Sequence, residues 1–366
     1  MRFFKSLYGQ VLPFHFSLSA DIQTLKENSQ KSHMTPGLLR VFAWSMVGLT
    51  LLFLFNNYLI FWRGWPGLWN FFAHHEMFGI SSLSKPLDSN ALTLGWIQSI
   101  ALVSMLSAIC LFVLKTPKRT LLEDSDILSR FAAYLTRACF WAVLLVGFVD
   151  ITISFLRVEG FLKSMLGNSM AIELGRAVFR GTYVHYPLII ISFVIAYFVR
   201  GLGFTWLALL VVIAEFQIVI SRFVYSYEQA FMGDLVRMWY AALFLFSSSY
   251  ALITEGHVRV DVFYSRFKTK TKALSNAIGC VILGLPLCWV ILATGMWVRG
   301  SSLNGPLLVF EIYQQGFGMY VKYLMVGYLV VFAVSMLVQF MGYFLRNSAE
   351  LIGENIPPDQ QAQLNT

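Results

Sequence analysis

Long, nearly uninterrupted runs of apolar residues recur along the 366-residue chain, with short polar segments between them. A helix needs about 20 residues to cross the ~30 Å hydrocarbon core of a bilayer, and most of the runs reach that length. The pattern therefore predicts about eight transmembrane helices. The predicted spans cover residues 42–62, 91–114, 132–156, 183–199, 202–225, 234–254, 273–298 and 320–343.

The composition agrees with a membrane protein. Hydrophobic residues make up 57% of the chain and charged residues 13%, whereas roughly a quarter of a soluble domain is charged. A water-soluble globule could not bury so much apolar surface, which excludes a cytoplasmic enzyme, a disordered protein and a disulfide scaffold. Barrel strands would alternate apolar and polar residues over short segments. The continuous runs instead predict an all-α, polytopic transmembrane protein.

The net charge of +8 reflects Lys and Arg residues placed between the apolar runs, which indicates membrane topology and not nucleic-acid binding. The loop 255–272 is the most basic; it contains Arg259, Arg266, Lys268, Lys270 and Lys272. With that loop inside, both termini are predicted to be cytoplasmic. The segment Met1–Ala20 lacks the apolar core of a signal peptide, so we expect an uncleaved cytoplasmic segment.

Three ionisable residues fall inside predicted spans, where charge is costly and usually functional. Arg137 and Asp150 are thirteen residues apart, about 20 Å along a helix, so they cannot pair directly. Glu215 lies near the middle of the fifth span and needs a proton, a polar partner or a water-filled cavity. It is either part of an ion path or an interhelical hydrogen bond that fixes assembly, and we favour the hydrogen bond.

A second group of charged residues lies at the predicted outer ends of the fifth and sixth spans. It comprises Arg222, Glu228, Asp234 and Arg237. Asp234 and Arg237 are i, i+3 neighbours that can pair on a helix. The segment Tyr225–Gly233 is predicted to form a short amphipathic surface helix, and Phe161–Phe179 a second interfacial helix.

No pattern of catalytic or cofactor-binding residues is apparent. Five of the six histidines lie in loops or tails and the sixth, His185, at a predicted helix end, so paired haem ligation is not expected. The four cysteines, all in apolar runs, are predicted to be small core residues. They are Cys110, Cys139, Cys280 and Cys288. We expect neither a metal site nor a resident cofactor, and no enzyme activity.

The basic loop carries a recognisable motif, Gly256-His-Val-Arg-Val-Asp261. In this motif, between two helices, the chain resembles the small permease (Q) subunit of tripartite ATP-independent periplasmic (TRAP) transporters. The flanking segments Ser221-Arg222-Phe-Val-Tyr225, Asp234-Leu235 and Glu311-Ile-Tyr-Gln-Gln-Gly316 are also similar, most closely to the mannitol/chloroaromatic-type branch. The structural motif of this inner loop comprises Gly256, His257, Arg259 and Asp261, and the charges of Arg259 and Asp261 are predicted to tie the two helix ends together.

The resemblance covers about residues 202–346 and implies a domain organisation. It predicts a cytoplasmic arm (1–37), an additional four-helix region (38–200), a small-subunit-like four-helix module (201–346) and a flexible cytoplasmic tail (347–366). We found no convincing internal repeat between the first four spans and the last four.

The resemblance also implies a function. In this family a large permease subunit carries the substrate and sodium sites, and a periplasmic binding protein delivers an organic acid or related solute. The small subunit braces the large subunit in the bilayer and helps to dock the binding protein. The chain is thus expected in a bacterial inner membrane, in contact with lipids and both partners but not with nucleic acid. Candidate docking residues, besides the outer charged group, are Glu311, Gln314 and Gln315.

Two alternatives differ in class. The first is a membrane anchor for a quinone- or haem-linked redox complex, which the placement of the histidines opposes. The second is a self-sufficient transporter, which the scarcity of intramembrane charge and of broken helices opposes.

Overall fold

The computed structural model describes residues 34–83, 85–200, 204–253, 264–313 and 317–354. In this part of the chain every regular element is helical, and eight helical segments are long and apolar enough to span a membrane. The fold is therefore all-α and polytopic, as predicted. The first four spans contain α2 (Met34–Arg63), α4 (Ser89–Lys115), α5 (Leu121–Val158) and the joined α7 and α8 (Ala177–Arg180, Tyr186–Phe198). The last four contain α9 (Phe204–Val224), α10 (Ala230–Ile253), the joined α11 and α12 (Thr269–Gly279, Leu285–Met296) and α14 (Lys322–Ile352).

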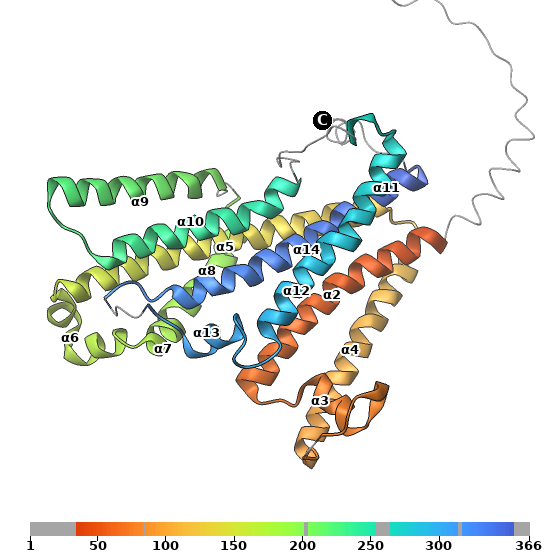
Figure 1. Ribbon diagram of the computed structural model, residues 1–366, viewed down its shortest axis with the longest axis horizontal. Helices are drawn as coiled ribbons and strands as arrows, with labels where there is room; N and C mark the ends of the chain where they lie inside the picture. Colours follow the sequence, from red (N-terminus) through yellow and green to blue (C-terminus); the bar gives the residue numbers. More distant parts are fainter. Residues whose placement is uncertain (1–33, 84, 201–203, 254–263, 314–316, 355–366) are drawn as a thin grey trace, which may run out of the picture.

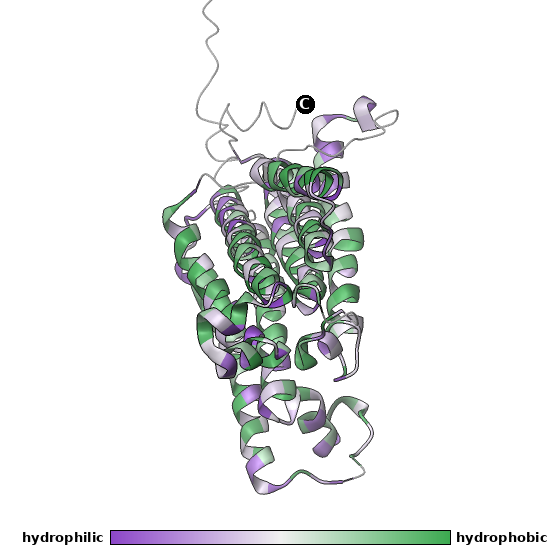
Figure 2. Cartoon of the chain, turned by 90° about the vertical axis from the view of Figure 1, so that its left-hand side faces the viewer, coloured by the Kyte–Doolittle hydropathy of each residue, from purple (hydrophilic) through white to green (hydrophobic). Residues whose placement is uncertain are grey.

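Shorter helices connect these spans at the end of the bundle predicted to face outward. They are α3 (Gly67–His74), α6 (Phe161–Leu174) and α13 (Asn304–Val309). The green of hydrophobic residues runs along the helices in Figure 2, as expected of a protein whose solvent is lipid.

Helices α5 and α14 form the centre of the bundle. Helix α5 packs against α14, α8 and α10, and α14 also contacts α2, α11 and α12. Helices α9 and α4 lie at opposite edges (Figure 1). Close approach depends on small residues, as is usual between helices in lipid. A Cβ on Gly147 of α5 would come within 2.7 Å of the Trp239 indole of α10.

Two of the spans contain a π-turn, at Gly181–His185 and at Cys280–Gly284. Each π-turn is followed by a helix with proline at its second residue, Pro187 in α8 and Pro286 in α12. Proline has no backbone N–H to donate to the preceding turn. The wider i→i+5 turn therefore accommodates the missing hydrogen bond while the helix continues.

Several predicted boundaries were wrong. Helix α5 begins at Leu121 and not at 132, and α14 continues to Ile352, so the first residues of the tail predicted for 347–366 are helical. Asn347, Ser348 and Ala349 are even buried. Polar residues in the first turns of α5 and the last turns of α14 hid these extensions, because they project beyond the apolar run.

The surface helix predicted for Tyr225–Gly233 is not formed. Residues 225–229 are non-helical and α10 begins at Ala230. Ser226 adopts a positive φ of 51°, which interrupts any continuous helix. The other predicted interfacial segment, Phe161–Phe179, forms α6 and the start of α7, with a kink at Gly167. Of the four cysteines predicted to lie in the core, Cys110 is exposed.

Candidate functional site

Asp150 lies in a buried polar cluster near the predicted outer end of α5. Its Oδ1 accepts hydrogen bonds from Arg180 Nη1 and His185 Nε2, both at 3.0 Å, and its Oδ2 accepts from the Tyr320 backbone N–H at 2.8 Å. Tyr323 Oη lies 2.9 Å from His185 Nδ1. A neutral imidazole with its proton on Nε2 satisfies both contacts of His185. Nε2 then donates to Asp150, and Nδ1 accepts a hydrogen bond from the Tyr323 hydroxyl.

The π-turn positions the two basic partners of Asp150. Arg180 and His185 are five residues apart, which on an α-helix points side chains about 140° apart. The i→i+5 geometry of residues Gly181–His185 brings both onto the side that faces α5. Gly181 is required here, because a Cβ would lie 2.2 Å from the Phe310 ring.

A short segment before α14, Gly318–Tyr320, is held by two carboxylates from different parts of the chain. Asp150 of α5 binds the Tyr320 N–H, and Asp234 of α10 accepts from the Met319 N–H at 3.0 Å. Ser154 Oγ donates to the Gly318 carbonyl at 3.3 Å. We call these contacts the carboxylate clamp. It joins the additional helices to the last four spans.

Cations over the Tyr320 ring complete the clamp. The guanidinium groups of Arg180 and Arg157 lie 4.1 Å and 4.7 Å from the ring centroid. The Tyr320 hydroxyl donates to the Gly175 carbonyl at 2.9 Å. Asp150, Arg180 and His185 are fully buried. The clamp is therefore closed to solute, and its chemistry is that of an interhelical brace.

A second ionic cluster lies at the opposite end of the bundle. Arg40 Nε of α2 contacts Asp124 Oδ2 of α5 at 2.6 Å, and the same guanidinium donates to the carbonyl and hydroxyl of Thr116. Arg119 approaches the other oxygen of Asp124 at 2.8 Å. The N-terminus of α5 is further held by Glu354, whose carboxylate accepts from the Leu121 N–H at 3.2 Å.

The remaining predicted residues are dispersed. Arg137 donates to the Ala196 carbonyl at 3.0 Å, and Asp234 pairs with Arg237 at 3.3 Å, as its spacing predicts. Glu215 is exposed on α9. Arg222 and Glu228 are exposed, with Arg222 Nε 3.5 Å from Glu228 Oε2. Glu311 pairs with Lys322, whose Nζ lies 2.5 Å from Glu311 Oε1. The motif residues Gly256, His257, Arg259 and Asp261 lie outside the described residues, as do Gln314 and Gln315.

The connection between α9 and α10 is tied to the end of α5. Tyr227 Oη donates to Glu159 Oε1 at 2.7 Å. Partial burial and this hydrogen bond to a carboxylate raise the pKa of the Tyr227 phenol to about 12, because both disfavour a second negative charge.

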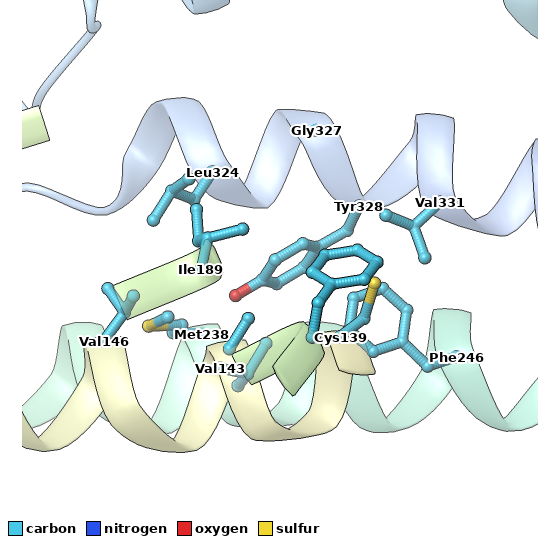
Figure 3. Close-up of a pocket in the computed structure, with 12 residues that line it drawn as sticks. Cys139, Val143, Val146, Ile189, Met238, Phe246, Leu324, Gly327, Tyr328 and Val331 are labelled. Atoms are coloured by element: carbon cyan, nitrogen blue, oxygen red, sulfur yellow. The ribbon is translucent and has the colours of Figure 1, made fainter. Parts of the chain in front are cut away.

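An apolar cavity of about 150 Å³ lies between α5, α8, α10 and α14 (Figure 3). Cys139, Ile189, Met238 and Leu324 are among its lining residues. The Tyr328 hydroxyl points into it, is buried and has no hydrogen-bond partner. Elsewhere, no group of three or more His, Cys, Asp or Glu side chains in the described ranges is arranged to hold a metal.

Sequence reasoning missed the partners of the buried carboxylates. It did not single out Arg40, Asp124 or Arg180 as buried charges, and it placed His185 at a helix end. One signal was available: an aspartate inside a span needs a partner at its own depth. Arg180 and His185 are basic residues around the start of the next predicted span, which begins at the same end of the bundle as Asp150.

Comparison with known proteins identifies the last four spans. Residues 208–350 match the family described as tripartite ATP-independent periplasmic transporters, DctQ component. No curated protein and no solved structure matches the chain. The matched region runs from α9 through α14 and nearly coincides with the region that resembled the small permease subunit. Residues 208–350 are therefore similar to the DctQ component of TRAP transporters, and four further helices long and apolar enough to span a membrane precede this region in the chain.

Proposed function

We propose that the chain braces the large permease subunit of a sodium-driven TRAP transporter in a bacterial inner membrane and helps dock the periplasmic binding protein. The transported solute is an organic acid or a related compound, and the large subunit carries the sodium and substrate sites. The observation that carries the proposal is the closed carboxylate clamp, which ties the additional helices to the DctQ-type region. Its intramembrane charges are used between helices, where they stabilise a rigid scaffold and face no solute path.

The bracing role is tested by reconstitution. The purified chain, the large subunit and both together are placed in proteoliposomes, with binding protein and a sodium gradient. Uptake is expected only when both membrane subunits are present. Uptake by this chain alone, or full uptake by the large subunit without it, would contradict the proposal.

Docking is tested at Glu228, which is exposed and pairs only loosely with Arg222. Charges at the rim of an interface steer encounter, and salt screens them. We expect Glu228→Lys to raise the binding-protein concentration for half-maximal uptake at low salt, with a smaller change in maximal rate. Glu311 is a less clean site, because its carboxylate pairs with Lys322 and its carbonyl accepts from the Tyr323 N–H.

Glu76→Lys is the matched control, since Glu76 is exposed two residues after the end of α3, a helix that lies far from α9 in Figure 1. An equal effect of the two reversals, or none at either salt concentration, would rule out docking at Glu228.

A further inference from the structure

Helix α9 lies at one edge of the molecule and has its main packing contacts with α10 alone (Figure 1). The side that faces α10 is formed by Leu207, Val211 and Ala214, which are buried. Most of the remaining surface of the helix is open and apolar. Helix α4, at the opposite edge, is equally exposed: 11% of the most hydrophobic stretch is buried in each of the two helices.

One residue distinguishes the two helices. Glu215 is exposed near the middle of the span Thr205–Val224, about 15 Å from either end along the helix axis. No side chain that the structure describes pairs with its carboxylate. By contrast, α4 has no Asp, Glu, His, Lys or Arg before its last residue, Lys115. An acidic group facing hydrocarbon at this depth is strongly unfavourable, so α9 needs a polar partner that α4 does not need.

The positions around Glu215 form a seam for another helix. One stripe of α9 has the spacing 4, 3, 4, 3, which is the heptad pattern of helices that pack side by side. Its residues are Ala208, Val212, Glu215, Val219 and Arg222. Val212 and Val219 are 63% and 48% exposed, so the seam is unoccupied by the rest of this chain.

We propose that this seam binds a transmembrane helix of the large permease subunit, which offers a hydrogen-bond donor or a cation at the depth of Glu215. The inference rests on the proposed function and assigns a surface to it. Lipid headgroups are too far from the helix centre to supply the donor. In a symmetric pair of identical chains the seams would bring two Glu215 carboxylates together, and like charges repel.

The first test is co-purification of tagged full-length chain with the co-expressed large subunit. Interhelical polar contacts in membranes correspond to about threefold to thirtyfold in an equilibrium constant. We expect Glu215→Leu to lower the large subunit recovered in diluted detergent by a factor in this range. Glu215→Gln, which keeps an acceptor, should lower it less. Glu215→Leu makes the exposed face more apolar, so membrane insertion should not suffer.

Gln217→Leu is the matched control, because Gln217 is also exposed at mid-span but lies on the other flank of α9. It should leave recovery unchanged. An equal loss for both variants, or undiminished recovery with Glu215→Leu, would overturn the assignment of the seam.

The second test is photo-crosslinking in the assembled complex. A photoreactive phenylalanine analogue at Val212 is expected to link the chain to the large subunit. The same analogue at Val103 of α4, a valine with nearly the same exposure, is not. Crosslinks from Val212 only to lipid or to a second copy of the chain would overturn the inference but leave the proposed function intact. Failure of the wild-type chain to bind the large subunit at all would overturn both.

Discussion

At the scale of single residues, the two aspartates of the carboxylate clamp show how an acidic side chain is accommodated inside a membrane protein. Asp150 accepts three hydrogen bonds, two of them from basic side chains, and Asp234 accepts from a backbone N–H and from Arg237. Removing one member of such a set costs more than the set contributes, because the partner stays buried without its counter-charge.

We therefore predict that Asp150→Asn destabilises the protein by about 3–5 kcal/mol, the cost typical of a broken buried ion pair. The measurement is the unfolding free energy or melting temperature of the purified chain in detergent. Asp126→Asn is the control, because Asp126 is an exposed carboxylate on the same helix. Similar melting temperatures for the two variants would show that the Asp150 cluster does not brace the fold.

The tyrosine that points into the apolar cavity leads to the opposite prediction. The Tyr328 hydroxyl is buried without a partner, which costs about 1–3 kcal/mol relative to a satisfied group. Tyr328→Phe should therefore leave stability unchanged or increase it. Tyr323→Phe should decrease it, since that hydroxyl binds His185. The measurement is the melting temperature of both variants. A lower melting temperature for Tyr328→Phe alone would show that the Tyr328 hydroxyl has a partner in solution.

At the scale of elements, the turn that joins α7 to α8 depends on a close approach. Gly181 faces the Phe310 ring, and the added Cβ of alanine would meet ring atoms at 2.2 and 2.4 Å. The phenylalanine follows α13 and is itself buried, so it has little space to move.

We expect Gly181→Ala to destabilise the fold by about 1–3 kcal/mol, the usual cost of overpacking. Gly233→Ala in α10 meets no atom within 4 Å and should be neutral or stabilising through helix propensity. Circular dichroism melts of the two variants provide the comparison. A tolerated alanine at residue 181 would mean that α8 and the Phe310 segment are not packed as described.

The eight spans and the Asp234–Arg237 pair were predictable, because hydrophobic runs and i, i+3 spacing are local properties of the chain. The partners of Asp150 and Asp124 were not. They depend on which helices become neighbours, and for Arg180 and His185 also on a π-turn that no apolar periodicity records.

At the scale of the whole molecule, the four additional spans share a core with the DctQ-type module. Helix α5 packs against α10 and α14, and its residues Cys139, Phe140 and Val143 belong to the same apolar cluster as Trp239 and Phe246 of α10. The apolar face that α10 and α14 of the module present to α5 is therefore covered by that helix.

This shared core predicts that residues 201–366 do not fold well alone. Expressed by themselves, they should give aggregated or low-yield material in size-exclusion chromatography. Co-expression with residues 1–200 as a separate chain should restore a monodisperse peak, because the helices can associate after insertion. A stable, monodisperse fragment 201–366 would show that the additional spans are dispensable for folding.

The clamp also has a consequence for biosynthesis. Asp150 and the Tyr320 N–H that it binds are separated by 170 residues. At a synthesis rate of 5–20 residues per second, roughly 10–30 s pass between the appearance of the carboxylate and that of its last partner. Arg180 and His185 emerge soon after Asp150; during that interval the Arg180 guanidinium can neutralise the carboxylate and His185 can donate a hydrogen bond to it. Because both partners are synthesised soon after Asp150, the first half of the chain can stay in the bilayer until the second half is made. No insertion factor is then needed to shield an unpaired carboxylate.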